Sequence, residues 1–362
     1  MFLSLSKMVS DKKALDIVVV GGSLAALMTS IPLTRLGHKV TILERSPTPL
    51  LHNQGAGVVA GGETQAFYAK HDLSRTPIAV HSKQRLYLDK EGGVMDREEI
   101  EQRMTSWDLL YYLGRANFDQ VDSEYLEGGM APGKLEESGE GRYEFGRVVT
   151  KVEDMGEKVL IHYEDTGKGA GDKNGIMEAD FLIAADGPSS RLRRMLIPHA
   201  AERKYAGYVA FRGTVPEDQI SEEVDNVFVE KFTFFHARGT QILSYAIPGT
   251  NGALQKGKRL VNWVWYCNYE EGSDEYLELM TDVDGKQHRF TVPTGGKMKQ
   301  EVLDKAKRRA KSQLPPQFAE LVEKTSYPFV QAITDLPPPD NVEVGRLLNG
   351  KAVLVGDALA GE

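Results

Sequence analysis

The strongest constraint on the fold of this 362-residue chain is a strand–turn–helix–strand pattern near its N-terminus. Residues 16–20 (DIVVV) form a short β-branched run typical of a central parallel strand, and they lead directly into Gly21-Gly22-Ser23. Apolar residues recur at helical spacing over 24–36, and a second strand at 39–43 ends at Glu44. This order within about 30 residues is the context that a dinucleotide-binding turn requires.

The turn and the acid have separate roles in binding a nucleotide. Gly21 permits the tight turn, and the N–H groups at the start of the helix face a pyrophosphate. Glu44 can accept hydrogen bonds from the adenosine ribose and disfavours a 2′-phosphate, so the pattern suits FAD or NAD rather than NADP. Ser23 and Ala26 replace the second and third glycines of the usual fingerprint. A crossover that binds no nucleotide therefore stays open at this point.

Two later segments repeat one layout, an apolar strand that ends in an acidic turn. The strand at 181–185 is followed by Asp186, and the strand at 351–355 is followed by Gly356 and Asp357. A carboxylate at the carboxyl end of a strand can bind a ribose or ribityl hydroxyl, which favours FAD over NAD. The sequence has no second GxGxxG and no Tyr-x-x-x-Lys. A flavoprotein with two Rossmann domains and a short-chain dehydrogenase are both disfavoured.

Charge and composition exclude several classes of protein. The formal net charge of −8 argues against a nucleic-acid partner, and the single cysteine, Cys267, excludes an internal disulfide framework. No apolar run approaches the roughly 20 residues that span a bilayer. The N-terminus lacks a basic region followed by an apolar one. We therefore expect a cytoplasmic chain without a membrane partner, and we predict no metal site.

Residues 201–300 alternate apolar and polar positions and contain many aromatic side chains, a pattern of antiparallel strands with one buried face. Most of these aromatic residues are expected in a sheet core, and some could line a flat apolar pocket for an aromatic ring. Arg212 could hold a phenolate or carboxylate, His236 could act as an acid or base, and Tyr245 could hydrogen-bond a ring hydroxyl. For each of these three, an exposed strand residue or a satisfied core hydrogen bond is the alternative.

The chain resembles the single-component, group A flavoprotein aromatic hydroxylases of the para-hydroxybenzoate hydroxylase type, from about residue 15 to its end. The matching segments are VVVGGSLAAL (18–27), TILERSP (41–47), QGAGV (54–58), SWD (106–108) with LGR (113–115), IAADGPSSRLRR (183–194) and VLVGDA (353–358). The segments closest to the 2,6-dihydroxypyridine 3-hydroxylase-like branch are YAGY (205–208), FRG (211–213), KFT (231–233), YAIPG (245–249) and WVWY (263–266).

The resemblance implies an α/β fold, a Rossmann-like FAD-binding domain with an inserted β-sheet substrate domain. The FAD-binding domain would comprise 14–75, 100–200 and 325–362. The substrate domain would comprise 76–99 and 201–300, with connecting helices at 301–324. The residues that the resemblance implies as cofactor contacts are Gly21, Gly22, Ser23, Glu44, Arg45, Gly57, Arg115, Asp186 and Asp357.

The same resemblance implies the chemistry. NADPH or NADH would reduce the FAD, and O2 would form a flavin C4a-hydroperoxide that hydroxylates a small electron-rich aromatic or heteroaromatic substrate. A homodimer is a further expectation from the family. In the family, a Gly-rich helix start and long helices follow the Gly-Asp motif, whereas this chain stops at Glu362. We therefore expect a C-terminally truncated member, and a catalytically impaired flavin-binding paralogue and an NAD-linked oxidoreductase are the competing hypotheses.

Overall fold

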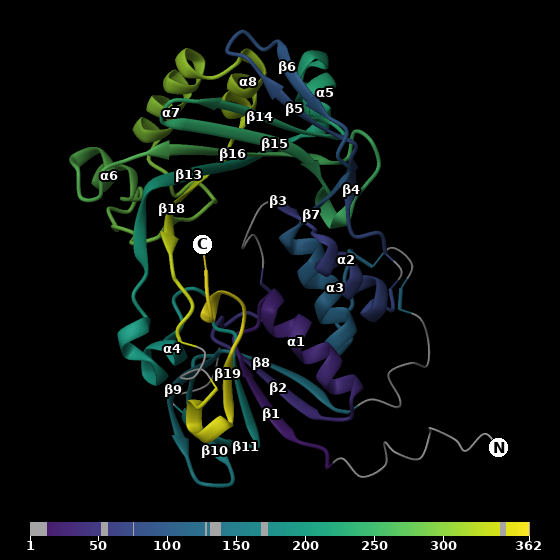
Figure 1. Cartoon of the computed structure of the whole chain (residues 1–362), viewed down its shortest axis with the longest axis vertical. Helices are drawn as coiled ribbons and strands as arrows, with labels where there is room; N and C mark the ends of the chain where they lie inside the picture. The colour runs from purple at the N-terminus through teal and green to yellow at the C-terminus, as the bar shows by residue number, and fades with distance from the viewer. Residues whose placement is uncertain are drawn as a thin grey trace, which may run out of the picture.

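The computed structural model describes residues 13–51, 57–74, 76–126, 129–130, 139–167, 173–340 and 345–361. The chain is built from two halves that meet along one interface, an α/β half and a large-sheet half (Figure 1). The first and the last strand of the described chain both belong to the α/β half, which lies at the bottom of Figure 1.

The α/β half is centred on a parallel five-stranded sheet with the order β19-β12-β1-β2-β8. Its strands are β1 (Asp16–Val20), β2 (Lys39–Glu44), β8 (Gly141–Phe145), β12 (Phe181–Ala184) and β19 (Ala352–Leu354). The predicted strands at 16–20, 39–43, 181–185 and 351–355 are thus found in one sheet. The expected α/β class with a Rossmann-like parallel sheet is confirmed.

Alternate side chains of this sheet enter two different cores, as the period of two along a strand requires. Val19 and Ile42 pack against α1 (Leu24–Arg35) and α3 (Trp107–Asp119) on one face. Val18 and Leu43 pack against a three-stranded antiparallel sheet on the other face. That second sheet consists of β9 (Arg147–Asp154), β10 (Val159–Asp165) and β11 (Lys173–Ala179). The remaining helices of this half are α2 (Gly62–His71) and α4 (Arg191–Leu196).

The large-sheet half contains eight strands in the order β17-β18-β13-β16-β15-β14-β5-β6. These are β5 (Gln84–Leu88), β6 (Val94–Glu98), β13 (Lys204–Pro216), β14 (Lys231–Ala237), β15 (Thr240–Ile247), β16 (Leu260–Asn268), β17 (Thr291–Val292) and β18 (Phe329–Asp335). The helices of this half are α5 (Glu222–Phe228), α6 (Asp274–Leu279), α7 (Gln300–Gln313) and α8 (Pro316–Lys324). The helices pack on one face through a core that includes Trp263, Trp265 and Phe318, while the other face looks toward the α/β half (Figure 1).

A small sheet and several single turns complete the described residues. The small sheet has the order β3-β7-β4, with β3 (Gly57–Val59), β4 (Val80–Ser82) and β7 (Gln102–Ser106). The 3-10 turns are η2 (Pro198–Ala200), η3 (Glu217–Gln219), η4 (Thr250–Gly252), η5 (Leu347–Gly350) and η6 (Gly356–Ala358). Met104 of β7 packs with Tyr245 of β15, so this small sheet joins the two halves.

The structure differs from the predicted domain boundaries in two places. Strand β18, which lies in the segment expected with the nucleotide domain, pairs with β13 in the large sheet. Its inward residues Val330 and Ala332 are apolar and enter the core beneath the helices. Helices α7 and α8 are more than connections, because Val302 and Leu321 bury their side chains in that same core. Strand pairing and core packing therefore assign both segments to the large-sheet half.

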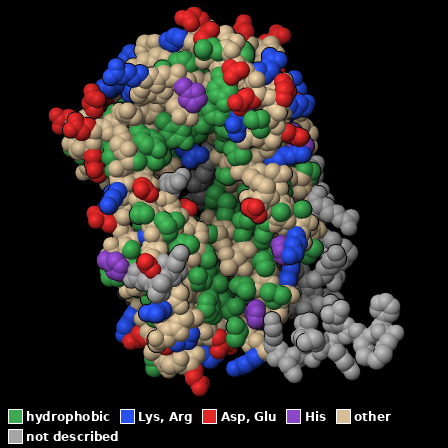
Figure 2. All heavy atoms as spheres, in the orientation of Figure 1, with side chains coloured by type: hydrophobic (Ala, Val, Ile, Leu, Met, Phe, Trp, Pro, Cys, Tyr) green, Lys and Arg blue, Asp and Glu red, His purple; other side chains and the backbone are tan. Residues whose placement is uncertain are grey.

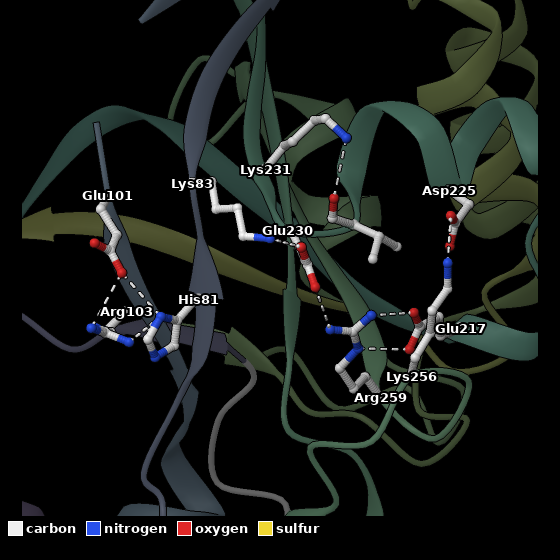
Figure 3. Close-up of polar contacts among 11 residues, drawn as sticks. His81, Lys83, Glu101, Arg103, Glu217, Asp225, Glu230, Lys231, Lys256 and Arg259 are labelled. Atoms are coloured by element: carbon white, nitrogen blue, oxygen red, sulfur yellow. Dashed lines mark hydrogen bonds and ion pairs between the residues drawn. The ribbon is translucent and has the colours of Figure 1, made fainter. Parts of the chain in front are cut away.

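Ion pairs close one end of the large sheet (Figure 3). Arg259 Nε donates to Glu217 Oε2 over 2.8 Å and Arg259 Nη2 donates to Glu217 Oε1 over 2.5 Å, with both side chains buried. Burial pushes the pKa of Glu217 up, but the hydrogen bonds from Arg259 and from the Gly257 amide outweigh it and lower the pKa. Beside this buried pair, Lys83 forms an exposed ion pair with Glu230 over 2.6 Å. The buried pair ties the start of β16 to the turn after β13.

Candidate functional site

The carboxyl ends of the parallel strands bring four of the predicted cofactor residues together. Gly21 follows β1 with a φ of +99°, and a Cβ there would lie 2.3 Å from the carbonyl oxygen of Ala185. Asp186 follows that same residue at the end of β12. Gly356 lies against Ala25 in the first turn of α1, which brings Asp357 to the same edge. Glu44 ends β2 beside them, so this edge has the layout of a nucleotide site.

The peptide groups on either side of Gly22 are held by two side chains. Its N–H donates to Glu44 Oε2 over 2.7 Å, and its carbonyl accepts from the Tyr143 hydroxyl over 3.1 Å. A Cβ at Gly22 would lie 2.0 Å from that hydroxyl. The other carboxylate oxygen of Glu44 accepts from the Ser46 N–H over 2.8 Å. The acid is therefore fixed in orientation, and each of its oxygens keeps a lone pair for a further donor.

Arg115 contacts the side chains that hold the Gly22 turn in place. Its guanidinium stacks on the Tyr143 ring at 3.6 Å and donates to the Tyr111 hydroxyl over 2.8 Å. It also donates to the carbonyl of Pro49 over 2.7 Å and forms an ion pair with Asp119 over 2.8 Å. Because most of its N–H groups already have acceptors, its predicted contact with a phosphate or ribose competes with these bonds, and that contact stays a prediction.

The other predicted contacts differ in how much of their bonding capacity is used. The Ser23 hydroxyl makes no capping bond to α1, and among the described residues Arg45 has no ion pair. The Asp186 carboxylate instead accepts from the Ser190 hydroxyl over 2.5 Å and from the Arg191 N–H over 2.7 Å. Desolvation raises the pKa of Asp357, and Arg203 opposes this shift.

These observations fit a bound dinucleotide. Gly21 makes a tight turn against the Ala185 carbonyl that leaves no room for a side chain, Ser23 offers a hydroxyl at the start of a 12-residue helix, and Glu44 offers oriented acceptor lone pairs. In Figure 2 the surface is hollowed between the two halves, and apolar side chains gather along the lower side of the hollow.

Gly57 lies where β3 meets the large sheet and is likewise held from both sides. Its N–H donates to Asn262 Oδ1 over 3.0 Å, and its carbonyl accepts from Arg212 Nη2 over 3.4 Å. A Cβ on Gly57 would lie 2.7 Å from the Tyr245 ring. The remaining residues of the predicted turn, 54–56, lie outside the described residues. Three polar side chains of the large sheet thus contact Gly57 of the small sheet.

These side chains keep hydrogen-bonding capacity that the protein does not use. Arg212 Nε and Asn262 Nδ2 are buried, and neither has a partner among the described residues. Burial raises the pKa of Tyr245 to about 12, while the charge of Arg212 acts in the opposite direction. The Tyr245 ring packs edge-on against Phe232 at 5.0 Å. The cluster therefore combines a cation, a neutral phenol and apolar walls.

A cavity of about 280 Å³ lies between the start of α3 and the large sheet, and it is linked to this cluster through Phe329 in its wall, whereas Arg212, Tyr245 and Asn262 do not line it. Its walls include Asp108, Thr214, Ile247 and Phe329. Phe329 also lies 5.8 Å beneath the Arg212 guanidinium. A volume of this size suits a ligand of one or two rings, somewhat below the span of drug-sized pockets.

His236, the third residue predicted for catalysis, lies apart from the cluster. It is exposed near the end of β14, and its ring stacks with Phe234 at 5.8 Å and with Tyr87 at 6.1 Å. The structure therefore brings Arg212 and Tyr245 together around Gly57. His236 instead lies exposed on β14 against Phe234 and Tyr87. Its catalytic role stays a prediction without a supporting contact.

Sequence reasoning missed Asn262, Gln331 and Tyr143. Gln331 Oε1 accepts from Arg212 Nη1 over 3.4 Å. Asn262 interrupts an apolar aromatic strand, and a polar residue at such a position is a signal that could have been used. Tyr143 carries no such signal, because an aromatic residue in a strand is ordinary.

Family models match a segment in each half of the chain. Residues 205–335 match the family model "FAD binding domain-like", and residues 16–60 match "Pyridine nucleotide-disulphide oxidoreductase". A 2,6-dihydroxypyridine 3-monooxygenase of Paenarthrobacter nicotinovorans is 30% identical over 343 residues, which cover 94% of this chain and 76% of the relative. The chain belongs to the FAD-dependent aromatic hydroxylase family. An FAD-dependent urate hydroxylase of Klebsiella oxytoca is 37% identical over 81 residues, 22% of this family member and 19% of the relative.

Solved structures agree with this family assignment. The 2,6-dihydroxypyridine-3-hydroxylase from Arthrobacter nicotinovorans superposes with a TM-score of 0.77 at 27% identity, covering 96% of this family member and 78% of that chain. Klebsiella pneumoniae HpxO complexed with FAD and uric acid shares the fold, with a TM-score of 0.63 at 18% identity over 95% of this chain and 73% of that one. Within the described residues no helix is long and apolar enough to cross a membrane, and no group of three or more His, Cys, Asp or Glu residues could hold a metal ion.

Proposed function

We propose that this chain is a monooxygenase that binds FAD and uses NADPH or NADH and O2 to hydroxylate a small electron-rich aromatic or heteroaromatic ring. The observation that carries the proposal is the cluster around Gly57. There a cation and a neutral phenol of the large sheet meet the α/β half beside a cavity of about 280 Å³. Family membership supports the reaction class.

One set of residues in this chain would bind the FAD cofactor. Gly21, Ser23 and Glu44 would hold the pyrophosphate and the adenosine ribose of FAD. The FAD held there would supply the redox chemistry that passes two electrons from the pyridine nucleotide to O2, so that one oxygen atom of O2 enters the ring and the other leaves as water. Arg45, Arg115, Asp186 and Asp357 remain further proposed contacts of the cofactor.

At the ring, charge and hydrogen bonding would favour attack. Arg212 would stabilise the deprotonated, electron-rich form of a ring hydroxyl, because an opposite charge nearby favours ionisation. Tyr245 would remain a hydrogen-bond donor throughout the neutral range, since its pKa is about 12. Phe232 and Phe329 would exclude water from the reacting face.

A direct test uses the purified full chain. We expect a flavin absorbance near 450 nm, faster oxidation of NADPH or NADH when a hydroxylated ring is added, and a product one oxygen atom heavier by mass spectrometry. Flavin that stays bound while no added ring yields product would contradict the hydroxylase proposal. Absence of bound flavin after supplementation with FAD would contradict the cofactor assignment.

A further inference from the structure

Asn262 presents a buried hydrogen-bond donor that no described group accepts. Its side chain is 0% exposed, and its Oδ1 is committed to the Gly57 N–H over 3.0 Å. Because that partner is itself a donor, the amide cannot be flipped, and the Nδ2 group must face the unpaired side. Buried amide groups nearly always find a partner, so this unpaired Nδ2 group is available to an acceptor that is not part of the described protein, a water or a ligand atom.

A second donor lies on the same face of the sheet. Asn262 pairs with Tyr245 across β15 and β16, and Arg212 of the next strand shares their face. Arg212 Nε is also buried without a partner, and no described carboxylate forms an ion pair with Arg212. The two side chains hold the N–H and the carbonyl of Gly57, so their free donors flank one short stretch of backbone.

We propose that Asn262 is a specificity-determining residue that donates from Nδ2 to an oxygen of the substrate ring. This inference rests on the proposed function and narrows its substrate class. The bound edge of the ring would carry two acceptor oxygens, one for Asn262 and one for Arg212. A ring that carries two hydroxyl groups on one edge, in oxo or deprotonated form, has such an edge. A ring with one oxygen leaves one buried donor unpaired, and a site built to hydrogen-bond a group rejects analogues that lack it.

The test compares two rings on the full chain loaded with FAD, with binding measured by isothermal titration calorimetry. The probes are 2,6-dihydroxypyridine, with two oxygens, and 2-hydroxypyridine, with one. Asn262→Asp keeps an acceptor for the Gly57 N–H and removes the donor. Ser244→Ala is the matched control, because Ser244 is equally buried and unpartnered but pairs with Trp263 on the opposite, helix-covered side of the sheet.

We expect the wild type to bind 2,6-dihydroxypyridine at least about 10-fold more tightly than 2-hydroxypyridine. Asn262→Asp should lower the affinity for 2,6-dihydroxypyridine by about 10- to 100-fold at pH 8 and the affinity for 2-hydroxypyridine by less than about 3-fold. Ser244→Ala should leave both affinities within about 2-fold. Equal weakening of both rings, or none, overturns the role of Asn262.

The wild-type ratio is a second readout that needs no variant, so a misfolded Asn262→Asp protein does not remove the test. A wild type that binds both rings equally well, yet hydroxylates either, overturns this inference and leaves the proposed function standing. A wild type that binds neither ring and shows no ring-stimulated oxidation of NADPH overturns both.

Discussion

Two glycines of this protein are held in the same way, yet the side chains that hold them differ in whether their hydrogen-bond donors are all used. Gly22 and Gly57 each have the N–H bound by one side chain and the carbonyl bound by another. At Gly22 the bonds measure 2.7 Å and 3.1 Å, and Tyr143 is itself stacked under Arg115. At Gly57 the carbonyl bond is 3.4 Å long, and both supporting side chains keep unused buried donors.

The difference teaches how to separate support from recognition in this fold. A polar network whose members satisfy one another is rigid and holds a backbone shape. A network with buried donors left over carries a free-energy cost of roughly 1–3 kcal/mol per group, which a ligand can remove. The Gly22 region therefore shapes a turn, and the Gly57 region is the better candidate for contact with a reacting ring.

The largest effect is expected from Gly22→Ala. The new Cβ would lie 2.0 Å from the Tyr143 hydroxyl and 2.9 Å from Glu44. Overpacking of about 3 kcal/mol and loss of one hydrogen bond of about 1 kcal/mol would weaken FAD binding by roughly 1,000-fold. Titration of apoprotein with FAD, followed by flavin fluorescence, measures this. Gly61→Ala is the control, because a Cβ at that position would have no described atom within 4 Å. Equal affinities of the two variants would show that the Gly22 turn is not rigid.

Arg259→Met tests a closed network that touches neither glycine. It leaves the Glu217 carboxylate buried without its partner, which costs about 3 kcal/mol of unfolding free energy at pH 7 in urea denaturation. The native pKa of Glu217 is lowered, so the pair stabilises the protein above the ordinary pKa of 4.5, and this stabilisation is lost as pH falls through the native value. The gap between variant and wild type should therefore shrink below about pH 4.5.

The double variant Glu217→Leu with Arg259→Met supplies the control, since replacing both charges by apolar groups should restore much of the loss. Affinity for FAD and for a ring should be unchanged in both variants. A change in ring affinity would mean that a closed network also contributes to recognition.

Arg212→Gln tests the open network around Gly57. Removing the cation should lower kcat/KM for a hydroxylated ring by about 30-fold, or about 2 kcal/mol, and leave FAD affinity within about 2-fold. Arg309→Gln is the matched control, because Arg309 stacks at 5.5 Å on Trp265, on the helix-covered side of the same sheet. Steady-state oxidation of NADPH with product analysis provides the measurement. A loss of FAD affinity without a loss of kcat/KM would show that Arg212 binds the cofactor and not the substrate ring.

The smallest effect is expected from Tyr143→Phe, which removes the hydroxyl bond to the Gly22 carbonyl and the long 3.4 Å bond to the Tyr111 hydroxyl. FAD affinity should fall by about 5-fold, or about 1 kcal/mol. Tyr205→Phe is a close control, because its hydroxyl donates to the carbonyl of Tyr269 over 3.0 Å in the large-sheet half. If both variants bind FAD like the wild type, the Gly22 turn holds its shape without Tyr143.

The sequence predicted the α/β half well because its signals are local. The β-branched run before Gly21, the apolar spacing of α1 and the acid at the end of β2 all lie within one crossover. The boundaries were less well predicted. Strand β18 and helices α7 and α8 lie far along the chain from their partners in the large sheet, so only the pairing of β18 with β13 and the packing of the helices against Trp263 and Phe211 assign them.

Sequence distance separates what the chain alone determined from what the tertiary structure decided. Gly22 and Glu44 are 22 positions apart, within one strand–helix–strand unit, so the sequence alone predicted that both belong to one nucleotide-binding edge. Gly57 is 155 positions from Arg212 and 205 from Asn262. No local pattern encodes such a meeting, because it depends on how two sheets dock. Sequence therefore determined the nucleotide turn, and tertiary structure decided which polar side chains of the large sheet contact Gly57 and keep their donors unpaired.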